Sequence, residues 1–275
     1  MSTTYAVLGC GWLGLPLAQS FLKAGHHIRG SVRSDSAFKT LTDVGLEAHQ
    51  ICLCEDQIVG DIFRFLEGVS RLYIILPPGL RKNPNRNFVA VIAHLVPHII
   101  KQKVKEVVFS SSTGVFGATQ GIVTPNTTPL PDTESGRQLL AVEQLLLAQT
   151  SFLTQILRLG GLVDQDRHPV QSLARRDRIP EPQAPVNLIH RADAIGLLNH
   201  LPTKAPWQSV YHGVLPWHPS KRDFYDQAAR EFGLFPLSFS EVVGATNKIV
   251  TDDRIQNGLA YRFKEPQLGL KSWTE

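Results

Sequence analysis

The chain has 275 residues, which at roughly 150 residues per domain is enough for one large domain or two small ones. Hydrophobic residues make up 43% of it and charged residues 19%, with ordinary shares of glycine and proline, so disordered, coiled-coil and collagen-like classes are excluded. The net charge is +4, but lysine and arginine are scattered and form no basic tail, which argues against a nucleic-acid partner.

The cysteine count and the apolar runs indicate a cytoplasmic protein. Three cysteines, an odd number, favour free thiols in a reducing compartment. The longest apolar stretches, residues 72–80 and 139–148, contain proline or glutamate and are too short to cross a bilayer. The start of the chain lacks the basic segment of a signal peptide. We therefore expect no membrane partner, and a monomer or a homodimer.

The N-terminal half alternates strand-like and helix-like segments, which is typical of a parallel sheet covered by helices. Leu13, Leu17 and Phe21 recur at four-residue spacing and mark one face of a helix that Gly25 would end. The same reasoning predicts strands at residues 4–8, 27–32, 71–76, 104–110, 152–159, 187–189 and 209–214. It predicts further helices at residues 35–44, 58–66, 89–99, 139–147 and 224–232. Asp35 or Ser36 would cap the helix at 35–44, and Pro97 would kink the helix at 89–99.

A glycine-rich turn follows the first predicted strand and opens the first predicted helix. Its sequence fits G-x-G-x-x-G, in which the glycines allow a tight turn, close approach to a pyrophosphate and close helix packing. The helix N-terminus adds free N–H groups and a partial positive charge. We therefore predict a dinucleotide site, against the alternative of a merely structural turn, at Gly9, Gly11, Trp12, Leu13 and Gly14.

The end of the second predicted strand bears on the choice between NAD and NADP. An NAD site has an acidic residue there, whereas a 2′-phosphate favours arginine and small donors. No carboxylate occurs before Asp35, and Arg33 with Ser31 or Ser34 suits a phosphate. This pattern favours NADP as the cofactor and leaves NAD as the alternative. Arg33 as an ordinary surface residue is the other interpretation.

Three further motifs resemble one known family. Residues 108–117 (VFSSSTGVFG) resemble the strand-end motif S-S-x-x-V-Y-G of the extended short-chain dehydrogenase/reductases, the NAD-dependent epimerase/dehydratase family. Residues 157–163 and 187–193 resemble its L-R-x-G-x-x-Y/V and N-x-I-H-x-x-D elements. The resemblance spans about residues 4–270. It implies a Rossmann doubly wound parallel sheet with a smaller α/β C-terminal substrate lobe: residues 1–165 as the NAD(P)-binding domain, and 166–275 as the lobe, interleaved with the last strands.

The chain departs from that family where its catalytic Tyr-x-x-x-Lys pair is expected. Ser135 stands at the tyrosine position and Leu139 at the lysine position, and an alkyl hydroxyl is no base without an activator. Leu8 also replaces the extra glycine of the extended family. These departures, Pro77-Pro78-Gly79 and the R-x-L-L-x-x-E stretch at residues 137–143 resemble an atypical branch, the YeeZ-like proteins.

The resemblance and the strand positions assign candidate residues. Ser112 matches the family's catalytic serine, Thr113 is a substitute donor, and His190 is a candidate general acid or base, although a structural role fits it equally well. His94 and His98 have zinc-compatible spacing but lack a third ligand, so no metal is expected. Leu76, Pro77 and Pro78 are predicted to flank the cofactor, and Arg167, Arg191 and Tyr211 to bind substrate.

These observations leave more than one function open. The first is an NAD(P)-dependent oxidoreductase or epimerase-like enzyme that acts on a small polar, nucleotide-sugar-like substrate. The second is a catalytically inactive NAD(P)-binding protein with a redox-sensing or scaffold role, which the missing Tyr and Lys support. A third follows from residues 11–18, which resemble the first helix of 3-hydroxyacid dehydrogenases. Those enzymes carry a catalytic lysine on a long all-helical C-terminal domain, and the late strands predicted here argue against it.

Overall fold

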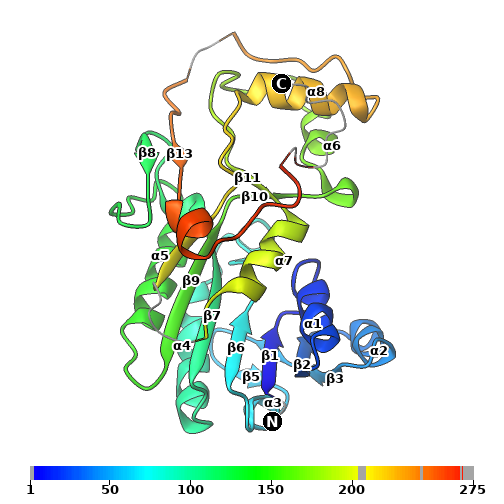
Figure 1. Ribbon diagram of the computed structural model, residues 1–275, viewed down its shortest axis with the longest axis vertical. Coiled ribbons are helices and arrows are strands. Elements are labelled where there is room, and N and C mark those ends of the chain that lie inside the picture. Colours follow the sequence, from blue (N-terminus) through cyan, green and yellow to red (C-terminus); the bar gives the residue numbers. More distant parts are fainter. Residues whose placement is uncertain (1–2, 204–208, 242–243, 267, 269–275) are drawn as a thin grey trace. The chain divides into compact units, whose positions relative to one another are not determined.

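A seven-stranded sheet is the main feature of the computed structural model, which describes residues 3–203, 209–241, 244–266 and 268. Neighbouring strands from β7 to β3 pair in parallel, and Figure 1 shows β7, β6 and β1 side by side. The strand order is β12 (Val210–Gly213), β9 (Leu153–Leu159), β7 (Glu106–Ser112), β6 (Arg71–Ile74), β1 (Thr4–Leu8), β2 (His27–Val32) and β3 (Glu47–Gln50).

This order is that of a Rossmann sheet with one additional strand. The chain progresses from β1 through β2 to β3 and then returns to the other side of β1 with β6. In the register, Leu8 at the end of β1 lies between Ser31 of β2 and Ile74 of β6. The order therefore reverses between β1 and β6, and in such sheets ligands bind outside the strand carboxyl ends at that point.

The helices that follow these strands bury apolar faces against them. α1 (Gly14–Lys23) packs on β1 and β2, and α2 (Asp35–Asp43) packs on β2 and β3. α4 (Phe88–Lys101), which contains Pro97, packs against α5 (Glu134–Leu147) and the short α3 (Ile62–Leu66). Each buried face has the helical period that the sequence shows; in α4 it consists of Phe88, Val91, Ile92, Leu95, Val96 and Ile99.

The chain forms two compact units that are interleaved along the sequence. The first unit comprises Met1–Ser112, Thr133–Leu157 and Thr203–Val210 and contains most of the sheet. The second comprises Thr113–Asp132, Arg158–Pro202 and Tyr211–Glu275. The boundary between residues 165 and 166 remains a prediction of the sequence.

The second unit is itself a mixture of helices and short strands. β10 (Gly161–Val163) pairs in parallel with β11 (Leu188–His190), and β8 (Ile122–Val123) with β13 (Ile249–Val250). Its helical elements are η1 (Thr113–Val115), η2 (Gln165–Arg167), α6 (Val170–Leu173), α7 (Arg191–His200), α8 (Lys221–Glu231) and η3 (Arg254–Gly258). In the described residues this unit is therefore not a long helical domain, which argues against the 3-hydroxyacid dehydrogenase alternative.

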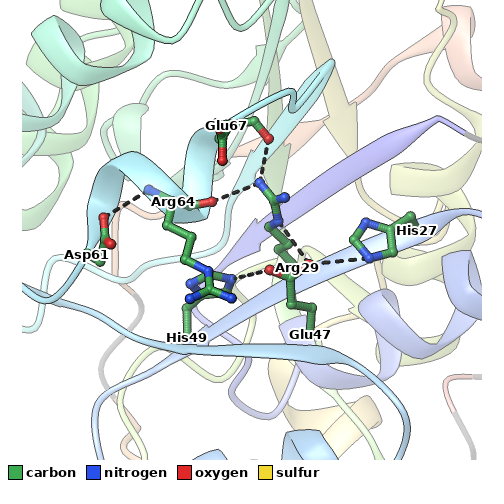
Figure 2. A network of polar contacts seen from close by, with 7 residues as sticks. All are labelled: His27, Arg29, Glu47, His49, Asp61, Arg64 and Glu67. Carbon is green, nitrogen blue, oxygen red and sulfur yellow. Dashed lines mark hydrogen bonds and ion pairs between the residues drawn. The ribbon is translucent and has the colours of Figure 1, made fainter.

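A polar network fixes the edge of the sheet in the first unit (Figure 2). The carboxylate of Glu47 on β3 lies 3.1 Å from Nε of Arg29 on β2 and 3.0 Å from Nε2 of His49. Arg29 also donates to the backbone carbonyls of Arg64 and Glu67 at the end of α3. Burial raises the pKa of Glu47, but the bonds from Arg29 and His49 outweigh it and leave the pKa lowered. Ion pairs and hydrogen bonds of side chains therefore add to the backbone pairing that holds the polar strand β3 against β2.

Two local predictions were wrong. Residues 58–66 form the strand β5 (Ile58–Val59) and the helix α3 instead of one helix, because Gly60 has φ +103° and separates them. The cap of α2 is Ser34, not Asp35 or Ser36, since its hydroxyl accepts the Ala37 N–H. Within the described residues, no helix has the length and apolar character that a bilayer crossing requires.

Candidate functional site

Gly9, the first residue of the turn after β1, has a backbone conformation that only glycine adopts readily. Gly9 has φ +101°, and a Cβ there would lie 2.6 Å from the carbonyl oxygen of Ile75. Its N–H donates to the Ser31 hydroxyl at 3.0 Å, and the next N–H donates to the Ser31 carbonyl at 2.8 Å. The turn is thus fixed between the ends of β2 and β6.

The other two glycines of the motif differ sharply in their surroundings. A Cβ on Gly14 would lie 2.1 Å from the Gly9 carbonyl oxygen, so α1 begins pressed against the turn. Gly11 is exposed, and no described atom lies within 4 Å of the position its Cβ would take. Leu13, the N-cap residue of α1, makes no side-chain cap bond to the described chain. The turn therefore combines an open surface at Gly11 with a helix N-terminus, which is the arrangement that binds phosphate groups.

The segment after β6 lies against this turn. The Ile75 N–H donates to the Leu8 carbonyl at 2.9 Å, which continues the β1–β6 pairing. The Leu76 side chain approaches Gly9, since its Cδ2 lies 2.7 Å from the position of a Cβ there. Pro77 is exposed and Pro78 is buried. The structure therefore brings the glycine turn and the Leu76–Pro78 segment together at the reversal of the strand order.

Arg33 and Ser34 are both exposed immediately after β2. Ser34 caps α2, and its hydroxyl lies 3.3 Å from the Ser36 hydroxyl. The Arg33 guanidinium forms no ion pair with any residue in the described ranges. Asp35 accepts a bond of 3.0 Å from Nε2 of Gln50. Ser31, in contrast, is buried and its hydroxyl is bound to the turn, so Ser34 is the exposed one of the two serines.

The serine motif lies at the end of β7. A buried hydrogen bond is made there by Ser111, one residue before Ser112, which the sequence predicts to be catalytic. The Ser111 hydroxyl donates to Oε1 of Glu143 on α5, a residue that is only 1% exposed. Ser112 is half-buried and Thr113 is buried. Sequence reasoning quoted Glu143 as part of a helix motif but gave it no role. The structure shows that this carboxylate positions the strand end.

The positions of the missing catalytic pair lie at the start of α5. Ser135 is half-buried in the first turn, where Thr133 caps the helix by accepting the Gly136 N–H at 3.1 Å. Leu139 is 4% exposed. An alkyl side chain in this place supplies no charge that would activate a neighbouring hydroxyl.

Lys248 contacts the loop that follows the serine motif, and no sequence pattern marks this residue. Its ammonium donates to the carbonyl oxygens of Thr113 at 3.2 Å and Phe116 at 2.9 Å. Burial lowers the pKa of Lys248. The amide of Asn187 bonds to the backbone on both sides of Ile249 in β13, to the Lys248 carbonyl and the Val250 N–H. Asn187, the first residue of the N-x-I-H-x-x-D motif, therefore holds Lys248 in register.

His190 and Arg191 meet a common carboxylate at the start of α7. Arg191 Nε lies 2.6 Å from Oδ2 of Asp164, and His190 Nε2 lies 3.6 Å from Oδ1. The His190 Nδ1 accepts the Ala192 N–H at 3.2 Å and caps the helix. The Nδ1 atom of His190 thus has a structural role at the helix cap, whereas Nε2 lies near the Asp164 carboxylate without a hydrogen bond to it. Of the other substrate candidates, Arg167 is exposed in η2 and Tyr211 is 2% exposed on β12.

Asp193, the last residue of that motif, anchors the chain that follows η3. It is fully buried, and its carboxylate accepts bonds from Tyr261 Oη at 2.8 Å, from the Lys264 N–H at 2.7 Å and from the Glu265 N–H at 3.0 Å. Burial and the bond to Asp193 raise the pKa of Tyr261. The motif aspartate is therefore a structural anchor within the second unit.

No group of three or more His, Cys, Asp or Glu side chains with metal-binding geometry occurs among the described residues. His94 Nδ1 lies 3.0 Å from the Ala90 carbonyl oxygen, and the His98 ring packs edge-on against Phe63 at 5.1 Å. These two histidines therefore have ordinary helix-surface partners.

One sequence comparison decides the family. No protein-family model matches the chain. Protein YeeZ of Escherichia coli strain K12 is 32% identical over 265 residues, which cover 95% of this chain and 96% of YeeZ. The chain belongs to the YeeZ family. The resemblance of its motifs to the YeeZ-like proteins is thereby confirmed.

Solved structures share the fold of this YeeZ-family chain at lower identity. UDP-glucose 4-epimerase from Thermotoga maritima with UDP-glucose has a TM-score of 0.78 and 14% identity, and 97% of this chain and 96% of the epimerase are covered. MoeE5 in complex with UDP-glucuronic acid and NAD has a TM-score of 0.76 and 18% identity, with 95% and 94% covered. The Rossmann sheet predicted from the sequence is thus confirmed.

Proposed function

We propose that this YeeZ-family chain is an NADP-preferring oxidoreductase or epimerase-like enzyme for a small polar substrate of the nucleotide-sugar kind. The observation that carries the proposal is the glycine turn. Gly9 and Gly14 have no room for a Cβ, whereas Gly11 faces open space beside the N-terminus of α1. Structural neighbours that bind NAD, UDP-glucose or UDP-glucuronic acid support the same kind of ligand.

In this proposal each segment of the first unit has a separate part in holding the dinucleotide. The N–H groups of Leu13 and Gly14, at the N-terminus of α1, bind the pyrophosphate, and Trp12, which is half-buried, borders it. Arg33 and Ser34 bind the 2′-phosphate, because a guanidinium without an ion-pair partner in the described chain and a hydroxyl are exposed together there. Leu76, Pro77 and Pro78 form the apolar border opposite the turn.

The bound nicotinamide would accept or donate a hydride at its C4 atom. Ser112 and Thr113 would hydrogen-bond the substrate oxygen that loses or gains a proton, as the family's serine does. The Ser111–Glu143 bond fixes the end of β7 that carries Ser112, and the Lys248 ammonium fixes the Thr113 carbonyl. Both of these side chains are positioning residues in this account.

Substrate binding is assigned to the second unit. Arg167, Arg191 and Tyr211 would contact an anionic or hydroxylated substrate, and Asp164 holds the Arg191 guanidinium in one orientation. His190 lies 9% exposed beside the same carboxylate and stays a candidate for proton transfer.

A catalytically inactive NAD(P)-binding protein is the second candidate, because Ser135 and the buried Leu139 replace the family's Tyr and Lys. A turnover assay distinguishes the proposed enzyme from an inactive NAD(P)-binding protein. We would incubate the full chain with NADPH or NADH and a panel of UDP-sugars and simple carbonyl compounds, and follow both cofactor absorbance and sugar products. For the enzyme we expect product formation that Ser112→Ala lowers about 100-fold and that Ser112→Thr largely restores.

The control for Ser112→Ala is thermal stabilisation by NADPH, which should be equal in variant and wild type. Cofactor binding with no product from any substrate in the panel would favour the inactive binder. Product formation that Ser112→Ala leaves unchanged would remove Ser112 from the proposed mechanism.

A further inference from the structure

A pair of cysteines lies on a hairpin that the proposed function does not use. Cys52 belongs to β4 (Cys52–Leu53), which pairs antiparallel with β5, and Cys54 follows directly. Alternate residues of a strand point to the same face, so both thiols lie opposite the buried Leu53. The two Sγ atoms are 4.0 Å apart, and both side chains are half-buried.

The third cysteine has the opposite character. Cys10 is 6% exposed, and its Sγ lies 3.5 Å from the Val7 carbonyl oxygen. Burial raises the pKa of Cys10 to about 12. Because the thiolate is the reactive form, Cys10 should be inert in the folded protein. The chain therefore contains an accessible pair of thiols together with an internal unreactive control.

We propose that Cys52 and Cys54 form a reversible intramolecular disulfide, with a low-molecular-weight disulfide such as oxidised glutathione as the oxidant. One cysteine thiolate attacks a glutathione sulfur, which gives a mixed disulfide and releases one glutathione thiolate. The second cysteine attacks the protein sulfur of that mixed disulfide and releases the other glutathione. Two protein thiols are oxidised, one glutathione disulfide is reduced, and the two thiol protons pass to the two departing glutathione molecules.

The geometry of the hairpin favours a bond that forms and is also readily reduced. Alternate residues of a strand have Cα atoms about 6.6 Å apart, at the long end of the roughly 4.4–6.8 Å that disulfides span. The sulfurs must move from 4.0 Å to about 2.05 Å, which side-chain rotation and a small contraction of the strand supply. A disulfide at this limit is strained, and strained exposed disulfides are the labile ones.

Either cysteine of the pair can attack first. The two thiols contact each other, and either sulfur can be the hydrogen donor. The hydrogen bond with Cys52, and then burial, raise the pKa of Cys54.

Oxidation of Cys52 and Cys54 should also change the structure at the start of α4. Glu55, next to the pair, accepts the Asn87 N–H at 2.9 Å, and the Asn87 side chain caps α4 by accepting the Ala90 N–H at 2.9 Å. A contraction of the strand at residues 52–54 displaces Glu55. We expect faster amide exchange at Asn87 in the oxidised protein, and the same change in the reduced Glu55→Ala variant.

The test counts thiols in the full-length chain. The protein is equilibrated with mixtures of reduced and oxidised glutathione, unfolded in denaturant with iodoacetamide, and analysed by intact mass and peptide mapping. We expect three alkylated cysteines under reducing conditions, and under oxidising conditions only Cys10 alkylated, with residues 52 and 54 joined. Dithiothreitol should restore all three. The count needs neither cofactor nor substrate, so it is independent of the proposed activity.

Matched variants make the outcome decisive. Cys10→Ser should form the same disulfide, whereas Cys52→Ser and Cys54→Ser should each retain one bound glutathione instead. Three alkylatable thiols at every glutathione ratio, separate glutathione adducts on Cys52 and Cys54 in the wild type, or a bond that includes Cys10 would each overturn the proposal.

Discussion

In the proposed function, Arg33 selects NADP over NAD. Arg33 and the following Ser34 are both exposed, the Ser34 and Ser36 hydroxyls contact each other, and Asp35 is bonded to Gln50. We expect NADPH to raise the unfolding temperature more than NADH, and Arg33→Ala to remove that difference. Hydrogen bonds to charged groups contribute about 1.5–3 kcal/mol, which corresponds to a loss of about tenfold or more in NADPH affinity.

The matched control is Arg137→Ala, which removes an exposed arginine paired with Glu134 on α5. It should leave the preference for NADPH intact. Equal stabilisation of the wild type by NADH and NADPH would show that Arg33 does not select the cofactor.

His168 gives the second unit a dependence on pH. Its ring is 5% exposed between Phe224 and Phe232, and burial lowers its pKa to about 4. The unfolded chain, with a histidine pKa of about 6.5, binds the proton first. The free energy of unfolding should therefore fall as the pH drops from about 6.5 to 4, by at most about 1.4 kcal/mol per pH unit for this one group.

The His168→Asn variant tests this, because asparagine can still accept the Val170 N–H but does not titrate. In urea unfolding between pH 4 and 7 the variant should be less stable at neutral pH and less dependent on pH. His212, whose pKa burial lowers to about 3, leaves part of the dependence in place. Equal slopes in the two proteins would contradict the assignment.

At the scale of elements, α7 and the segment at residues 261–265 are fixed together by Asp193 and Gly196. A Cβ on Gly196 would lie 2.1 Å from Tyr261 Oη, the same hydroxyl that donates to Asp193. Asp193→Asn places an amide nitrogen among three donors. We expect it to lower the free energy of unfolding by about 3 kcal/mol.

Urea unfolding measures that loss, and Asp177→Asn serves as the control because Asp177 is an exposed carboxylate. The control should change the free energy of unfolding by less than about 0.5 kcal/mol. A similarly small effect of Asp193→Asn would show that the motif aspartate is not an anchor.

The sequence predicted those elements whose signal lies in local periodicity. The strands β1, β2, β6 and β9 and the buried face of α4 follow directly from apolar spacing. β3 was missed because its residues are polar and are held by the Glu47 network. The helix at residues 58–66 was wrong because Gly60 packs with its Cβ position 2.1 Å from the Gln50 carbonyl oxygen, a contact outside its own segment.

The candidate site likewise contains one part that the sequence predicts and other parts that it does not. The glycine turn was predictable, because its three glycines form one short sequence motif between a strand and a helix. The bonds between Ser111 and Glu143 and between Lys248 and Thr113 join residues 32 and 135 positions apart. No local pattern marks such pairs, since they exist only once the sheet and the second unit are folded.

At the scale of the whole molecule, the two interleaved units have different roles in the proposed function. The first unit contains the glycine turn, Arg33 and the Leu76–Pro78 segment. The second unit contains Lys248 and the Asp164 carboxylate with its neighbours His190 and Arg191. The central claim concerns the first unit alone: the turn after β1 holds a dinucleotide.

The most direct test of that claim is the stabilisation of Gly11→Val by NADPH. A Cβ at Gly11 meets no described atom within 4 Å, so without ligand the variant should unfold at nearly the temperature of the wild type. Its methyl groups would occupy the space proposed for the pyrophosphate. NADPH at 100 times its dissociation constant should stabilise the wild type by about 2.7 kcal/mol and leave the variant unchanged. An equal stabilisation of both proteins would contradict the account.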